Sequence, residues 1–363
     1  MSRPVSVAIT SVYGGDTPSA GLLAAQMLRR QQGMDLRVIV LATEAFGDGI
    51  FGLHVADRVV VTPPLARDPE AFLAELRRLR REVGRLVLLP GSPGDIIALA
   101  PWQPALQRAG VRSVLPRAAR LGELPFPSTG RAVRAPKYFV VAGPNALQAL
   151  RRPWRYPVVV RWADGRVAWA HSSTDLHAVL YAAPAGATAG IHETIPGIEI
   201  GVATVTAGAA PGGLVAARPL NVSESGVVWS AVTMSTPRLV GDARRTLAAL
   251  RWTGPAEARF VLDERGRLWF TGLTPGFPSW VPLTAAAGQD LVLEYVRLAL
   301  GLRASRRTTF ADGTFLARVS VDHATTIDAL RQLVVQGEIN HEASHARYLR
   351  TPPHRPARVA RAG

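Results

Sequence analysis

The chain contains no cysteine and only one lysine, Lys137. The absence of cysteine excludes disulfide bonds and thiolate metal sites. Nearly all of the positive charge is therefore arginine, and the formal net charge is +15. Together with the heavy use of Ala, Gly and Pro, this pattern is typical of a GC-rich coding sequence. It also raises the question of an acidic partner, because strong basicity attracts polyanions.

Long apolar runs are also missing. A membrane-spanning helix needs about 20 consecutive apolar residues, and the sequence has no such run. The first ten residues, MSRPVSVAIT, carry one arginine and a short apolar stretch, without the features of a secretory signal. We therefore expect a cytoplasmic protein that does not enter a membrane. Nucleic-acid binding is not expected either, because no zinc finger, RNP aromatic pair or clear helix-turn-helix is present.

The apolar content is 48% over 363 residues, which is enough to bury a large core in two or three domains. Apolar strands alternate with amphipathic helices in the first third, as expected of parallel βαβ units covered on both faces. The expected strands span 5–9, 36–41, 58–61 and 86–89, with helices over 21–30 and 69–83 and from residue 95 to 99. A Pro-rich stretch then breaks the pattern, which predicts a linker over 122–136.

Residues 254–280, GPAEARFVLDERGRLWFTGLTPGFPSW, form the most informative segment. Two apolar runs, 256–262 and 268–273, flank the polar turn Asp263-Glu264-Arg265-Gly266, which predicts a β-hairpin. Asp263 is expected to serve this turn.

In its order of features the chain resembles the ATP-grasp superfamily, in the branch of carbamoyl-phosphate synthase and the carboxylate–amine ligases. The resemblance covers roughly residues 5–302. The motifs that carry it, in chain order, are the strand YPVVVR at 156–161, the segment ETIPGIE at 193–199, the run LAALRWTGP at 247–255, and PGFPSW at 275–280.

This resemblance implies a fold of mixed α/β and α+β class. A Rossmann-like pre-ATP-grasp domain (1–121) would precede the linker, followed by a two-lobed ATP-grasp-like domain (137–340). For residues 341–363 the composition, rich in Arg and Pro, predicts a basic, disordered tail. In the family, the hairpin carries a Glu on its first strand and a Glu-x-Asn-Pro-Arg run on its second, which hold Mg²⁺ against the nucleotide phosphates.

At those positions this chain has Arg259, Gly272, Thr274 and Gly276. Arginine reverses the charge that a hard cation needs, and glycine offers no side-chain oxygen. Mg²⁺ is therefore not expected, we name no catalytic residue or metal ligand, and we expect a degenerate member that does not catalyse ligation. Glu257, two residues before Arg259 and thus on the same face of the strand, is the candidate substitute ligand. An active ligase with a displaced metal site is the alternative.

Nucleotide binding is a separate question, because an adenine pocket needs apolar walls and backbone groups rather than a metal. The resemblance assigns a phosphate contact to Arg161, where the family has lysine, and the adenine and ribose contacts to Glu193, Ile195 and Glu199. ATP or ADP is therefore the candidate cofactor. The loop 162–166 has a single glycine and makes a poor phosphate cradle.

The candidate partners are an active ATP-grasp paralogue or a peptide. The tail has five arginines from Arg347 to Arg361 and no acidic residue after Glu342, so it could also bind an acidic partner. A basic protein that binds an acidic polymer or nucleic acid is the third hypothesis. The motif His341-Glu342-Ala343-Ser344-His345 imitates a zinc signature but stands at the edge of this tail, and we do not interpret it as a metal site.

Overall fold

The computed structural model describes residues 4–13, 18–45, 55–124, 134–136, 138–142, 154–162, 166–183, 187–207, 211–223, 226–304, 309–319 and 327–340. The expected tail, most of the expected linker and the centre of the loop 162–166 lie outside these residues. No helix within the described ranges is long and apolar enough to cross a membrane.

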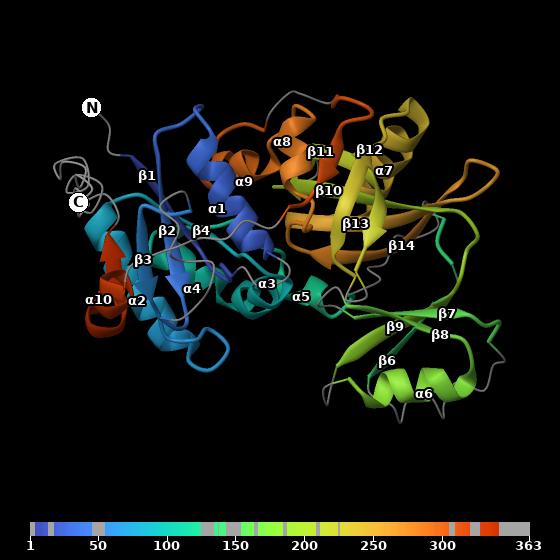
Figure 1. Cartoon of the computed structure of the whole chain (residues 1–363), viewed down its shortest axis with the longest axis horizontal. Helices are drawn as coiled ribbons and strands as arrows, with labels where there is room; N and C mark the ends of the chain where they lie inside the picture. Colours follow the sequence, from blue (N-terminus) through green and yellow to red (C-terminus); the bar gives the residue numbers. More distant parts are fainter. Residues whose placement is uncertain are drawn as a thin grey trace, which may run out of the picture.

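The first domain is built on a six-stranded sheet in the order β16-β3-β2-β1-β4-β5 (Figure 1). Its first five strands in the chain are parallel and buried, which confirms the predicted βαβ pattern. They are β1 (Val5–Ile9), β2 (Leu36–Ala42), β3 (Arg58–Val61), β4 (Leu86–Leu89) and β5 (Val111–Arg112). The helices between them are α1 (Ala20–Arg30), α2 (Pro69–Val83), α3 (Pro93–Leu99), α4 (Gln103–Arg108) and α5 (Ala118–Leu121), with a 3₁₀ turn, η1 (Ala100–Trp102).

The end of the described chain returns to this first sheet. Helix α10 (Ile327–Gln336) leads into β16 (Glu338–Asn340), which pairs antiparallel with β3. Arg58 of β3 contacts Glu338 at 2.6 Å and so fixes the added strand. The expectation that residues up to 340 belong to the ATP-grasp-like domain is therefore wrong for 327–340, because these residues complete the sheet of the first domain.

A small four-stranded sheet follows, in the order β6-β9-β7-β8. Its strands are β6 (Tyr138–Ala142), β7 (Val158–Trp162), β8 (Val167–Ala170) and β9 (Thr188–Glu193), all antiparallel to their neighbours. One face packs on helix α6 (Ser173–Tyr181), where Leu176 and Leu180 join Val158, Val160 and Ile191 in a separate core. The opposite face of this sheet carries Arg161 and His192.

The third unit is a six-stranded antiparallel sheet in the order β14-β13-β10-β11-β12-β15. Its strands are β10 (Ile198–Thr206), β11 (Pro211–Val222), β12 (Val228–Thr233), β13 (Gly254–Leu262), β14 (Leu268–Pro275) and β15 (Phe315–Ala317). Helices α7 (Pro237–Leu250), α8 (Pro282–Ala286) and α9 (Leu291–Ala299) accompany it. The predicted hairpin is thus confirmed as β13 and β14.

The large sheet and the first domain share one core, in which residues such as Val7, Val87, Val202 and Tyr295 are buried together. The hydroxyl of Tyr295 on α9 donates to the carbonyl of Leu88 at 2.7 Å and accepts from the amide of Val114 at 3.1 Å. The small sheet lies below the large one in Figure 1 and is linked to it through β9 and β10. Arg161 of the small sheet and Arg259 of the large one, two of the predicted site residues, lie close enough for their charges to interact.

Candidate functional site

Strands β10, β13 and β14 form the upper wall of the site. Their register sets Gly201, Arg259 and Gly272 in one row and Ala203, Glu257 and Thr274 in the next. Paired residues of neighbouring strands point to the same face of a sheet, so these six positions share one surface. A β-bulge interrupts the ladder immediately after Arg259, where Gly272 has a φ of 144°. Bulges of this kind re-aim the side chains beside them.

Glu257 and Arg259 form an ion pair on this wall. Arg259 Nη2 donates to Glu257 Oε2 at 3.0 Å, and the indole Nε1 of Trp280 donates to Glu257 Oε1 at 2.8 Å. Glu257 is only 5% exposed. Both carboxylate oxygens of this candidate substitute ligand therefore already accept hydrogen bonds from protein groups.

Gly201 makes this arrangement possible. A Cβ at this position would lie 2.7 Å from Glu257 Oε1 and 3.2 Å from the Trp280 ring, both closer than ordinary contact. A side chain on β10 would thus displace the carboxylate or the indole. Neither Gly201 nor Trp280 was predicted as a site residue from the sequence. The PGFPSW motif was the only signal that pointed to Trp280.

Arg161 of β7 closes the site from the small sheet. Its Nη2 lies 3.4 Å from Glu199 Oε1 of β10, and its side chain is 5% exposed. Its Nε and Nη1 are buried and have no hydrogen-bond partner among the described residues. Burial, followed by the charge of Arg259, lowers the pKa of Arg161 to about 10, which still leaves the guanidinium charged at neutral pH. Two guanidinium groups, one from each sheet, thus lie close enough for their charges to interact.

The face of the small sheet opposite α6 carries a row of side chains whose central members, His192 and Val159, are buried like Arg161. Tyr138, His192, Val159 and Trp169 are cross-strand neighbours on β6, β9, β7 and β8. Tyr138 is 37% and Trp169 50% exposed, although both are large aromatic side chains. Exposed aromatic surface beside a buried cation is suited to a ligand that has both a planar ring and a negative charge.

His192 in this row should make the stability of the protein depend on pH. Burial, and then the charge of Arg161, lowers the pKa of His192 to about 4, while Nδ1 donates to the carbonyl of Glu193 at 2.9 Å. The unfolded chain binds the proton near pH 6.5 and the folded chain only near pH 4. Stability should therefore be complete above pH 6.5 and fall by up to about 3 kcal/mol as the pH drops toward 4.

Urea unfolding between pH 7.5 and 4.5 measures this effect. His192→Gln should flatten the decline, whereas His177→Gln, which changes an exposed histidine of α6, should leave it unchanged. Equal slopes in both variants would show that other groups cause the dependence.

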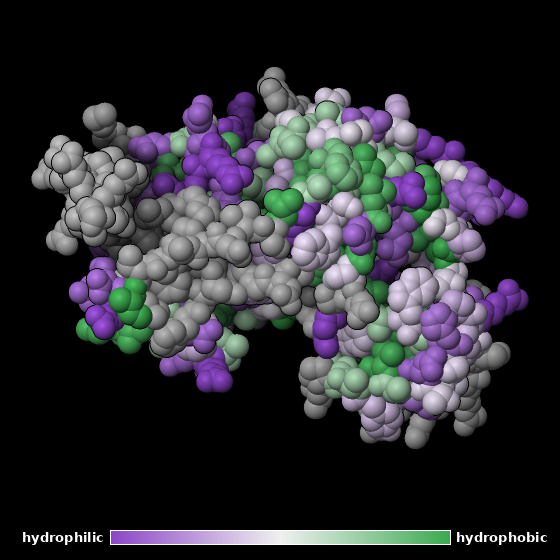
Figure 2. All heavy atoms as spheres, in the orientation of Figure 1, coloured by the Kyte–Doolittle hydropathy of each residue, from purple (hydrophilic) through white to green (hydrophobic). Residues whose placement is uncertain are grey.

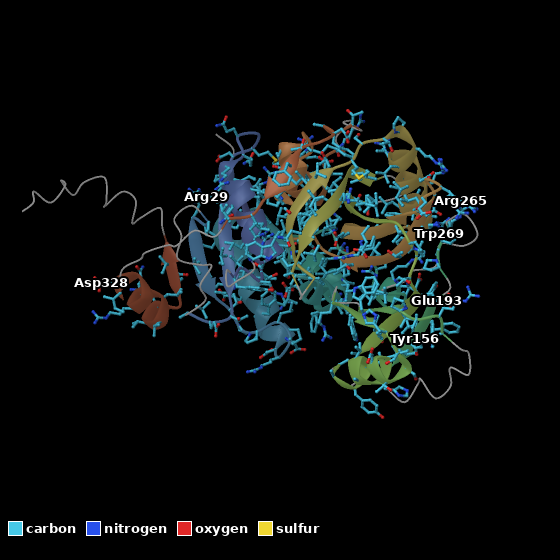
Figure 3. The ribbon with its side chains drawn as sticks, turned by 45° about the vertical axis from the view of Figure 1, so that its right-hand side comes forward. Arg29, Tyr156, Glu193, Arg265, Trp269 and Asp328 are labelled. Atoms are coloured by element: carbon cyan, nitrogen blue, oxygen red, sulfur yellow. The ribbon has the colours of Figure 1, made fainter. Side chains whose placement is uncertain are left out.

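Glu193, Ile195 and Gly276 are the other predicted site residues, and none of them forms a hydrogen bond or ion pair with Arg259 in the described part of the chain. Glu193 Oε1 accepts from the amide of Arg155 at 3.2 Å, so this carboxylate holds the segment that leads into β7. Ile195 is half-buried in the connection between β9 and β10. Figure 3 shows Glu193 and Tyr156 on the small-sheet side, below Trp269 and Arg265 of the hairpin. Gly276 has a φ of 98° and abuts Ile96 of α3, so it faces the first domain rather than Arg259.

Asp263 serves the hairpin turn, as predicted. It accepts from the amides of Arg265 and Arg267 and from the indole of Trp269. Within the described part of the chain, no three or more His, Asp or Glu side chains are grouped so that they could hold a metal ion.

No protein-family model matches the sequence, and no curated protein matches it. Solved structures with the ATP-grasp fold do match over most of the chain. An L-amino acid ligase from Bacillus licheniformis has 16% identity and a TM-score of 0.59, covering 83% of this chain and 75% of its own. A biotin carboxylase from Campylobacter jejuni, solved with β,γ-ATP, has 13% identity and a TM-score of 0.60, covering 86% and 74%.

An ADP complex of an N5-carboxyaminoimidazole ribonucleotide synthetase gives a similar result. It has 14% identity and a TM-score of 0.59, and the alignment covers 84% of this chain and 80% of that one. At such identities the likeness establishes the fold, and the chain has the ATP-grasp fold that the sequence motifs predicted.

Proposed function

We propose that this chain is a degenerate ATP-grasp protein that binds a nucleotide or a similar anion between its two sheets without Mg²⁺ and does not catalyse ligation. The observation that carries the proposal is the Glu257–Arg259 ion pair at the position where the fold family has metal ligands. A guanidinium there repels a divalent cation and attracts the phosphate that the cation would otherwise neutralise.

The two arginines supply what such an anion needs. Arg161 has two buried nitrogens without partners, and Arg259 has one, its Nε. Buried donors without partners are costly, and an anion that accepted from them would remove that cost. It would also offset the repulsion between the two guanidinium groups. Trp169, which is 50% exposed on the strand next to that of Arg161, offers an aromatic surface for a base.

The residues present do not fit Mg²⁺. Glu257 is the nearest carboxylate to Arg259, and both of its oxygens already accept hydrogen bonds, from Arg259 and Trp280. Thr274 offers one hydroxyl in the same row, and Gly272 offers none. This geometry argues against the alternative of an active ligase that uses Glu257 as a displaced ligand, since the carboxylate would first have to abandon a buried pair.

A titration with ATP and ADP, with and without Mg²⁺, tests the proposal. We expect binding in EDTA that Mg²⁺ does not strengthen, with no release of phosphate. Arg161→Met should weaken ATP binding about tenfold, because a charge-assisted hydrogen bond of about 1.5 kcal/mol is lost. Arg265→Met, which removes an exposed arginine of the hairpin turn, is the matched control. Binding that requires Mg²⁺, or ATP turnover by the wild type, would contradict the proposal.

A protein without ligase chemistry would act by binding, and we propose pairing with an active ATP-grasp paralogue or a peptide as its role in the cell. The alternative of an acidic polymer depends on arginine clusters. Figure 2 shows hydrophilic side chains spread among apolar ones on the visible face, not gathered in one stripe. Many arginines are also neutralised locally, for example Arg78 by Glu75 and Arg245 by Asp242. These observations favour the nucleotide over the polymer.

A further inference from the structure

A cavity lies in the first domain, and neither Arg161 nor Arg259 lines it. It has a volume of about 360 Å³ and is formed at the carboxyl ends of β1, β2 and β3, with Asp95 of α3 at its edge. In Figure 1 these strands lie in the left half of the molecule, whereas β7 and β13 lie in the right half. The chain runs from β1 to β2 and β3 on one side and then crosses to β4 on the other. Open α/β sheets bind ligands at such a crossing.

The backbone at the base of this cavity is held in an unusual conformation. Ser11 has a φ of 50°, which a residue with a side chain rarely adopts. The carbonyl of Thr10 lies so close to Gly21 and Gly91 that a Cβ on either would approach within 2.5 Å and 1.9 Å of it. Both glycines are therefore required where α1 and the turn after β4 meet β1.

This packing also orients Asp95. The amide of Gly91 donates to Thr10 Oγ1 at 3.0 Å, and Thr10 Oγ1 donates to Asp95 Oδ2 at 2.6 Å. The amide of Asp95 is in turn held by Ser92 Oγ at 3.1 Å. The carboxylate is thus fixed through one oxygen, and the other accepts no hydrogen bond from the described residues.

The lining combines negative charge with apolar surface. Asp95 and Glu44 supply two carboxylates, and none of the described residues that line the cavity is Arg, Lys or His. Leu65 and Phe72 provide apolar walls. The Tyr13 phenol lies near Asp95, and burial followed by the Asp95 charge raises its pKa, so it remains neutral. The two carboxylates would repel an anion. They do not form a metal site either, because no group of three or more potential metal ligands occurs among the described residues.

We propose that this cavity binds a small primary amine with an apolar body, whose ammonium group is held by Asp95 and Glu44 and whose hydrocarbon part packs on Leu65 and Phe72. Its ligand thus has the opposite charge to that of the arginine pair between the sheets. The two sites differ in chemistry, and this inference does not depend on the function proposed above.

Three matched probes test the charge requirement: 2-phenylethylamine, the neutral 2-phenylethanol and the anionic 3-phenylpropanoate, titrated into the full chain and followed by ligand-observed NMR. We expect the amine to bind at least tenfold more tightly than the alcohol, and the anion not to bind. Asp95→Asn, which keeps an acceptor for Thr10, should weaken the amine about tenfold, as loss of a charged hydrogen bond implies.

Glu44→Gln changes an exposed residue, so it tests the same claim if Asp95→Asn does not fold, and it should weaken the amine at least threefold. Glu264→Gln, an exposed carboxylate of the distant hairpin, should have no effect. Equal affinity for amine and alcohol would overturn the proposal. Unchanged amine affinity of the Glu44→Gln variant would also overturn it. So would loss of amine binding in the Glu199→Gln variant, because the amine would then bind near Arg161 and Glu199 instead.

Discussion

Replacing Arg259 by glutamate and Thr274 by asparagine should give the protein an affinity for ATP that depends on Mg²⁺. The first change removes the cation from the row that contains Gly201 and Gly272, and it sets a second carboxylate beside Glu257. Two carboxylates that repel each other alone become favourable ligands once a divalent ion lies between them. Isothermal titration should show that the double variant binds ATP at least a hundredfold more tightly with Mg²⁺ than in EDTA. The wild type should bind ATP equally tightly under both conditions.

Gly272 is best left unchanged in this double variant. Its φ of 144° at the bulge strains any residue with a side chain, so a glutamate there would mix a folding defect with the gain of a ligand. Arg265→Glu is the matched control, because it makes the same change of charge on the exposed turn of the hairpin. If the control gained the same dependence on Mg²⁺, the effect would be one of net charge. If the double variant gained none, the metal position assigned to Arg259 would be wrong.

The hairpin itself could be predicted because a strand has a simple period. The pairing of Arg259 with Gly272 could not, because the register that pairs Phe260 with Phe270 shifts by one residue at the bulge. Side chains alternate along each strand, and the polar turn around Asp263 fixes where the two strands face each other before the bulge. The same rule placed Glu257 and Arg259 on one face, and their 3.0 Å contact confirms it. Buried parallel strands such as β1 and β4 were likewise evident from their continuous apolar runs.

Contacts between distant parts of the chain could not be predicted in this way. The bond from Trp280 to Glu257 spans 23 residues, and that from Arg58 to Glu338 spans 280. Neither hydropathy nor spacing encodes such a partner, and a three-residue strand like β16 has too few residues to show a period. The role of Gly201 is visible only once the carboxylate and the indole that need its space have been placed.

The Glu257 carboxylate leads to the last prediction. Glu257→Gln should lower the free energy of unfolding by about 3 kcal/mol, because it leaves Arg259 without its counter-charge on a largely buried surface. The amide oxygen can still accept from Trp280, so the indole should stay in place. Urea unfolding at pH 7.5 measures the loss, and Trp280 fluorescence in a variant series reports whether the ring has moved.

The same variant should bind ATP more tightly than the wild type does in EDTA, because the space between Arg161 and Arg259 then carries more positive charge. This gain separates the two main hypotheses. If Glu257 were the ligand of a displaced metal, its loss would instead weaken nucleotide binding and abolish turnover. The control is Glu264→Gln, which removes an exposed carboxylate and should change neither stability nor affinity. A less stable protein with higher affinity for the anion is the pattern expected when the carboxylate exists to neutralise Arg259 rather than to hold a metal.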